Sequence, residues 1–171
     1  LYYQYNKDNP KGTERNFGIL FLRYRGGKPM NISKFTQKSI QAVQDLEKVA
    51  YEYGNQEVEQ EHLLYALLTQ EDSLILKLIE KMEINKDYFI NVVKKALDAK
   101  VKVSGGDLRF GQYLNKSLVN AENEAKAMGD EYVSVEHLFL SLLTQPSPSM
   151  KKIFNEFGIT RERFLQALST V

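Results

Sequence analysis

An internal repeat constrains the fold of this chain more than any other feature of its sequence. When the sequence is shifted by 75 residues, the segment 35–96 aligns with the segment 110–171 without a gap. The densest match sets Val58–Gln70 over Val133–Gln145, and both segments contain Glu-His-Leu at the same place. Matching residues at a constant spacing indicate that one structural unit has been duplicated. Both halves of the chain are therefore expected to have the same fold.

Each repeat unit has the sequence pattern of four helices. Apolar residues recur at intervals of three and four between Phe35 and Tyr53, which is typical of one helix face. Gly54 and Gly129 follow the first helix of each unit, where glycine commonly ends a helix. Asn85 and Thr160 precede the fourth helices, where they can act as N-caps. The sequence predicts an all-α fold of eight helices, arranged as two four-helix repeats that are related by a pseudo-twofold axis.

The repeat also predicts the boundaries along the chain. The first four-helix repeat is expected over residues 30–98, a Gly-rich linker over 99–109, and the second repeat over 110–171. Residues 1–29 lack the helical pattern and are basic, and Met30 opens the patterned part of the chain. We interpret residues 1–29 as an extension outside the native domain, or alternatively as a targeting segment.

Composition and missing motifs exclude several classes of function. The net charge of +1 argues against a general nucleic-acid binder, and every apolar run in the sequence is too short to span a membrane. There is no cysteine, no phosphate-binding loop and no dinucleotide motif. The two histidines, His62 and His137, occupy equivalent positions and are expected to pack or cap a helix rather than bind metal. We therefore predict a domain with no cofactor and no enzymatic activity of its own.

Two segments of the chain resemble a known family. Lys34–Ser39 resembles the opening of a Clp N-terminal domain, and Met128–Leu138 is very similar to the second-repeat signature of ClpB-type protein disaggregases. The resemblance covers residues 30–171. It implies a cytoplasmic, substrate-binding domain that captures unfolded or aggregated client proteins, organellar if residues 1–29 are a targeting segment. It also implies a parent protein that is a hexamer and binds ATP in separate modules, whereas the isolated domain is monomeric.

The resemblance points to polar residues that handle clients. Thr36, Asp130 and Glu136 match positions implicated in ClpB N-terminal domains, and Glu61 is the repeat mate of Glu136. Each residue also has a structural explanation. Thr36 can cap the first helix, Asp130 can stabilise a turn, and both glutamates can lie in the first turn of a helix.

A second set of candidates is apolar. Leu114 and Leu118, together with Phe139, could line a groove between the two units that binds exposed aliphatic segments of a client. The alternative is that these three side chains belong to the core.

Two other functions remain open from the sequence. One is an adaptor-binding or phosphoarginine-binding domain of a ClpC-type or ClpA-type protease ATPase, in which Glu61 and Glu136 would each bind one mark. The repeat mate of Thr36 is Gly111, so at least one of these two sites would be incomplete. The other is a stand-alone helical scaffold with no ATPase attached.

Overall fold

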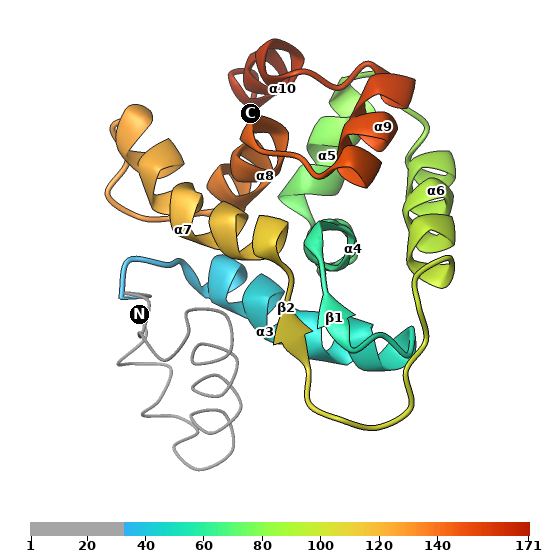
Figure 1. Ribbon diagram of the computed structural model, residues 1–171. Coiled ribbons are helices and arrows are strands. Elements are labelled where there is room, and N and C mark those ends of the chain that lie inside the picture. The colour runs from blue at the N-terminus through green and yellow to red at the C-terminus, as the bar shows by residue number, and fades with distance from the viewer. Residues whose placement is uncertain (1–32) are drawn as a thin grey trace.

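The computed structural model describes residues 33–171, so the prediction for residues 1–29 falls outside the described residues. In this part of the chain there are eight helices, four on each side of residues 99–108, and the all-α prediction is confirmed (Figure 1). The helices of the first unit are α3 (Gln37–Glu52), α4 (Gln60–Leu68), α5 (Leu74–Lys81) and α6 (Lys86–Asp98). Those of the second unit are α7 (Gln112–Ala127), α8 (Val135–Thr144), α9 (Pro148–Phe157) and α10 (Arg161–Leu168).

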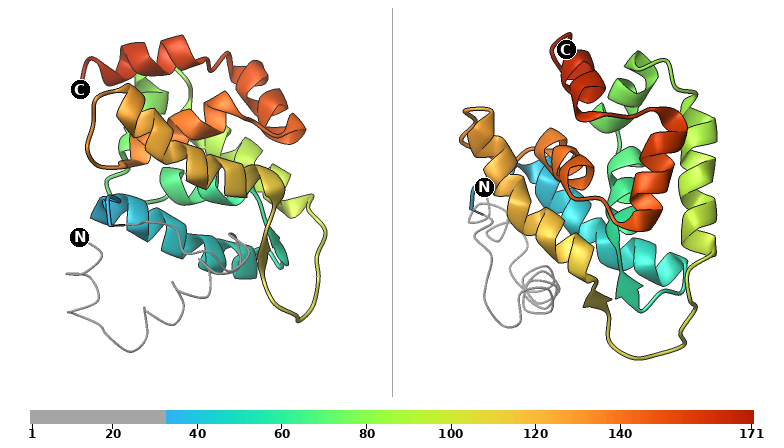
Figure 2. Two further views of the ribbon diagram at one scale, coloured as in Figure 1. Left: turned by 60° about the vertical axis from the view of Figure 1, so that its left-hand side comes forward. Right: turned by 45° about the horizontal axis from the view of Figure 1, so that its top comes forward.

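The two units interlock rather than lie end to end. Within each unit the first helix packs on the second, α3 on α4 and α7 on α8, and the first helix of each unit also contacts the second helix of the other. The outer helices cross over in the same way, because α5 contacts α10 and α6 contacts α9. The segment 99–108 leaves the body of helices as a loop in all three ribbon views (Figures 1 and 2).

Two short backbone pairings show the pseudo-twofold relation directly. Strands β1 (Glu57–Val58) and β2 (Arg109–Phe110) run parallel, with Val58 opposite Phe110. An isolated parallel bridge joins Phe35 to Val133. Phe35 and Phe110 are repeat mates, and so are Val58 and Val133, so each bridge becomes the other when the units are exchanged. The sequence did not predict these short strands, which add to the helical fold without changing its class.

The helix ends are set by local residues, as the sequence predicts. The side chains of Asn85 and Thr160 accept hydrogen bonds from backbone N–H groups in the first turns of α6 and α10. Gly54 and Gly129 follow α3 and α7 with φ of 68° and 74°, values that favour glycine.

The core is one continuous cluster of apolar side chains from both units. Phe89 and its repeat mate Phe164 are both fully buried, and each would contribute about 2 kcal/mol by leaving water. The second helix of each unit, α4 or α8, packs into this core, and Glu61 and Glu136 lie in the first turns of these two helices.

Candidate functional site

A cleft lies where the first helix of one unit meets the second helix of the other. Its volume is about 490 Å³, and we call it the junction cleft. Its lining residues come from the start of α3, from the start of α8 and from the segment before and into α5: Thr36, Gln37, Lys38, Ser134, Val135, Glu136, Gln70, Asp72 and Leu74. Two of the sequence-predicted residues, Thr36 and Glu136, therefore come together although they belong to different units.

Thr36 fixes the wall of the cleft that α3 provides. Its hydroxyl oxygen accepts a hydrogen bond from the Ser39 N–H at 3.3 Å, so it is the N-cap of α3, as predicted. Its backbone N–H donates to the Val133 carbonyl at 3.0 Å, and the Ser39 hydroxyl donates to the same carbonyl at 2.8 Å. These bonds hold the start of α3 against the residues that lead into α8.

Glu136 lies in the first turn of α8 and is half-buried. A carboxylate there is favoured by the helix dipole. Among the described residues, no basic side chain comes within ion-pair distance of its carboxylate, which faces a cleft also lined by Leu74 and Val135. The junction cleft thus places the Glu136 carboxylate near two apolar side chains, and this combination suits a cationic and partly aliphatic segment of a partner.

Asp130 has a different position. Its carboxylate lies 2.8 Å from Nε2 of His137 and is 46% exposed, whereas His137 is buried. The Nδ1 atom of His137 accepts a hydrogen bond from the Ser134 N–H at 2.8 Å. Asp130 does not line the junction cleft but acts on it indirectly, since it holds the histidine that caps α8.

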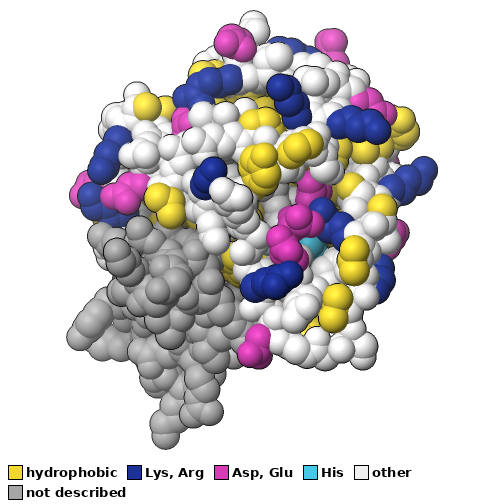
Figure 3. All heavy atoms as spheres, in the orientation of Figure 1, with side chains coloured by type: hydrophobic (Ala, Val, Ile, Leu, Met, Phe, Trp, Pro, Cys, Tyr) yellow, Lys and Arg dark blue, Asp and Glu magenta, His cyan; other side chains and the backbone are white. Residues whose placement is uncertain are grey.

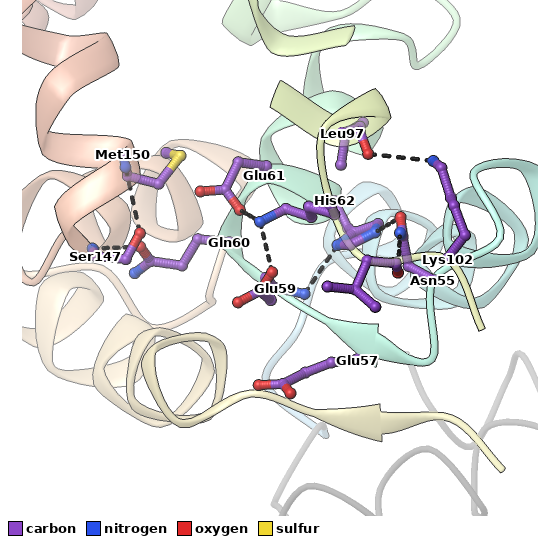
Figure 4. A network of polar contacts seen from close by, with 12 residues as sticks. Asn55, Glu57, Glu59, Gln60, Glu61, His62, Leu97, Lys102, Ser147 and Met150 are labelled. Carbon is purple, nitrogen blue, oxygen red and sulfur yellow. Dashed lines mark hydrogen bonds and ion pairs between the residues drawn. The ribbon is translucent and has the colours of Figure 1, made fainter. Parts of the chain in front are cut away.

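Glu61, the repeat mate of Glu136, is in a closed environment. Its side chain is only 2% exposed, and its carboxylate lies 2.7 Å from Nζ of Lys100. Lys100 also contacts Glu59 at 2.5 Å. Burial by itself disfavours the ammonium group, but the bonds to Glu59 and Glu61 outweigh that effect and raise the pKa of Lys100. At this exposure Glu61 has almost no surface to offer to a client. Figure 4 shows it within a network of polar contacts.

The prediction that Leu114 and Leu118 on α7 and Phe139 on α8 line a groove is corrected by the structure, which buries all three side chains in the core. Leu114 and Leu118 are 0% and 1% exposed, and Phe139 is fully buried between Phe154 and Phe164. The physical reason is that α7 packs on α8 with its apolar face. The helical periodicity that made these residues candidates is the same pattern that buries them.

The histidines serve the backbone, as the sequence predicts. His62 repeats the arrangement of His137: its Nδ1 accepts the Glu59 N–H at 2.9 Å, and its Nε2 lies 2.9 Å from Oδ1 of Asn55. Within residues 33–171 no group of three or more His, Cys, Asp or Glu side chains could hold a metal ion. No helix in this range is both long and apolar enough to cross a bilayer.

A second hollow, of about 520 Å³, lies between the end of α5 and α10. Its basic side chains already have partners within the domain. Lys81 donates to the carbonyl and hydroxyl of Thr170, and Arg163 donates to the carbonyls of Met82, Phe157 and Gly158. This hollow therefore has the weaker case as a binding site.

Sequence reasoning missed Lys100 and most of the residues that line the junction cleft, among them its two apolar residues, Val135 and Leu74. Lys100 lies in the segment taken as a linker, and its repeat position, 175, is beyond the sequence, so the repeat could not mark it. Val135 and Leu74 are apolar residues within amphipathic patterns, which do not distinguish a cleft wall from the core.

The fold defines a class of protein: a helical domain built from a duplicated four-helix unit. The Clp repeat (R) N-terminal domain family matches residues 34–169, and the chain belongs to this family.

Curated relatives agree with this assignment. The chain is 38% identical over 148 residues to the chaperone protein ClpB of Nitratidesulfovibrio vulgaris and 40% identical over 147 residues to that of Clostridium tetani. Each match covers 83% of this chain and 17% of the relative, so the chain spans about a sixth of the length of these proteins.

Solved structures share the fold. The Hsp104 N-terminal domain from Candida albicans superposes with a TM-score of 0.68 at 22% identity, covering 78% of this chain and 88% of that one. A complex of the ClpV N-domain with a VipB peptide has a TM-score of 0.62 at 23% identity, covering 81% and 89%.

Proposed function

We propose that this chain is the substrate-binding N-terminal domain of an ATP-dependent, ClpB-type protein disaggregase, and that the junction cleft captures unfolded segments of client proteins. The ATPase modules of the parent hexamer, which we place in the cytoplasm, would then take over the captured segment. The single observation that carries this proposal is the cleft that Glu136, which forms no ion pair with a described basic side chain, lines together with Thr36 and the apolar residues Leu74 and Val135.

The chemistry of the cleft suits weak and reversible binding. One carboxylate and a few aliphatic side chains provide little directional recognition, and a client segment loses conformational entropy when it docks. Such a site accepts many sequences that share a basic residue next to aliphatic ones. A domain that must release its cargo needs this kind of surface.

The test is a titration of the ¹⁵N-labelled chain with a permanently unfolded protein, followed by NMR chemical shifts. We expect saturable shifts at the starts of α3 and α8. Glu136→Gln should weaken the apparent affinity by about tenfold, or about 1.4 kcal/mol, through loss of a charge-assisted contact. Glu162→Gln is the matched control, since Glu162 also lies in the first turn of a helix but is exposed on α10, outside the cleft. Shifts scattered over the surface, or equal losses in both variants, would disprove client capture at this cleft.

Two alternatives are separated by the same measurement. The ClpV N-domain was solved with a VipB peptide. If this chain binds an adaptor, one defined protein should bind tightly and shift its NMR signals, whereas unfolded clients should cause no shifts. If the function is phosphoarginine binding, free phosphoarginine should displace the client at Glu136, and free arginine should not.

A further inference from the structure

The pseudo-twofold axis places a twin of the junction cleft on the other side of the molecule. Exchanging the units carries Thr36 onto Gly111 at the start of α7, and carries Ser134, Val135 and Glu136 onto Glu59, Gln60 and Glu61 at the start of α4. Two equivalent clefts would be expected from the repeat alone. The structure shows that side chains of the chain itself occupy the second one.

Gln60 occupies the inner part of the twin cleft. Its Nε2 donates to the Ser117 hydroxyl at 2.8 Å and to the Gln145 carbonyl at 2.9 Å, and its Oε1 accepts the Ser147 N–H at 2.8 Å. Figure 4 shows the Gln60 side chain next to Ser147. Gln145 and Ser147 are the repeat mates of Gln70 and Asp72, which line the junction cleft. Val135, the repeat mate of Gln60, is too short and apolar to make such bonds.

Lys100 occupies the acidic part of the twin cleft. Its ammonium group lies between Glu59 and Glu61 and is 16% exposed. A hollow of about 420 Å³ outside this group is lined by Glu59 and Lys100 but not by Glu61, so Lys100 separates Glu61 from the hollow. Figure 3 shows acidic and basic side chains gathered on this face, over β1 and α4.

We infer that Gln60 and Lys100 determine which of the two equivalent clefts binds a partner: they close the twin cleft with the chain's own amide and ammonium groups, and the domain therefore docks a client at one site only. Lys100 forms the ion pair with Glu61 that a basic residue of the client would form with Glu136. This inference rests on the proposed function of the junction cleft. It adds that the domain has one client site, and that Gln60 and Lys100 are the residues that limit it to one.

The test opens the closed cleft. The probe is an end-capped peptide in which one lysine is flanked by leucines, titrated into the ¹⁵N-labelled chain. For the native chain we expect one peptide per domain and shifts confined to the starts of α3 and α8. The double variant Gln60→Val/Lys100→Gln copies the open side at position 60 and removes the internal cation. It should bind a second peptide, with a new set of shifts at the starts of α4 and α7.

The control variant is Lys100→Arg, which keeps a cation on Glu61 and should keep one site. Shifts at the starts of α4 and α7 in the native chain would overturn the inference, and so would a folded double variant that still binds one peptide. If the native chain binds no peptide but the double variant binds one at α4, the proposed function fails and the closure by Gln60 and Lys100 stands.

A measurement on the native chain covers the case in which the double variant does not fold. Limited acetylation of the folded protein, read by mass spectrometry, should modify the exposed Lys126 well before Lys100, because Lys100 is enclosed by two carboxylates. Equal rates of modification at the two lysines would show that Lys100 does not close the cleft.

Discussion

At the scale of single residues, one histidine in each repeat performs a task that a glutamate or glutamine side chain usually performs. The Nδ1 atoms of His62 and His137 accept the N–H groups of Glu59 and Ser134, so each ring caps a helix start from inside the helix. An Nδ1 atom that accepts a bond must be unprotonated, and the neutral form then carries its proton on Nε2. The partner of Nε2 differs between the repeats, an amide in Asn55 and a carboxylate in Asp130.

The environment of His62 predicts how stability depends on pH. Burial, and then the positive charge of Lys100, lower the pKa of His62 to about 4 from an ordinary value near 6.5. Between these values the unfolded chain binds the proton and the folded chain does not, so the free energy of unfolding falls as the pH drops from 6.5 toward 4. The loss should reach about 3 kcal/mol by pH 4.

Urea unfolding at a series of pH values from 7.5 to 4.5 checks this prediction. His62→Gln should be less stable at pH 7.5, because the cap is altered, but its stability should change less across the same range. His137→Gln keeps His62 and should retain the loss that His62 causes. A native chain with the same stability at pH 7 and pH 5 would contradict the low pKa of His62.

At the scale of helices, a buried carboxylate joins three elements of the second unit. Glu124 of α7 is 7% exposed; its carboxylate lies 2.7 Å from the guanidinium of Arg161 on α10 and accepts the Thr144 hydroxyl of α8 at 2.6 Å. Burial favours the protonated acid, but the bonds from Arg161 and Thr144 prevail and lower the pKa of Glu124. Arg161→Met leaves this buried charge without its ionic partner and should lower the free energy of unfolding by about 2 kcal/mol.

The matched control for that variant is Arg109→Met. Arg109 pairs with Glu57 at 3.5 Å but is 71% exposed, so its removal should change stability by less than about 0.5 kcal/mol. Urea unfolding at pH 7 compares the two variants. Equal losses would mean that burial of Glu124 does not make its ion pair more important than an exposed one.

Helices were the part of the fold that the sequence predicted best. Their signals are local: Asn85 and Thr160 cap helices through bonds to residues three positions away. The cleft depends on residues about a hundred positions apart. The repeat predicted that the two units contact each other, but it did not predict which residues form the contact. Thr36 and Glu136 were found through a family resemblance, whereas Leu114 and Leu118 were misplaced because an apolar pattern marks burial of any kind. Lys100 gave no signal, since its role depends on the path of a loop.

At the scale of the whole molecule, the units complete each other. The Phe35–Val133 and Val58–Phe110 bridges each join one unit to the other, and both first helices pack across the boundary. We therefore expect the chain to unfold in one transition, with coincident loss of NMR signals from both units. The separate pieces 33–98 and 107–171 should not fold alone. A well-dispersed NMR spectrum from either piece would show that the contacts between the two units are not needed for folding.

The reciprocal bridges have a consequence for ancestry. Two copies of a single unit could form a homodimer through these contacts, because the start of each copy would pair with the middle of the other and a twofold axis would make both contacts identical. In such a dimer any side chain that blocked one cleft would block both, and the protein would lose its function at once. Joining two copies in one gene removes that coupling. One half can then change while the other keeps its cleft, and the difference between Gln60 and Val135 is what we expect from such a division of roles.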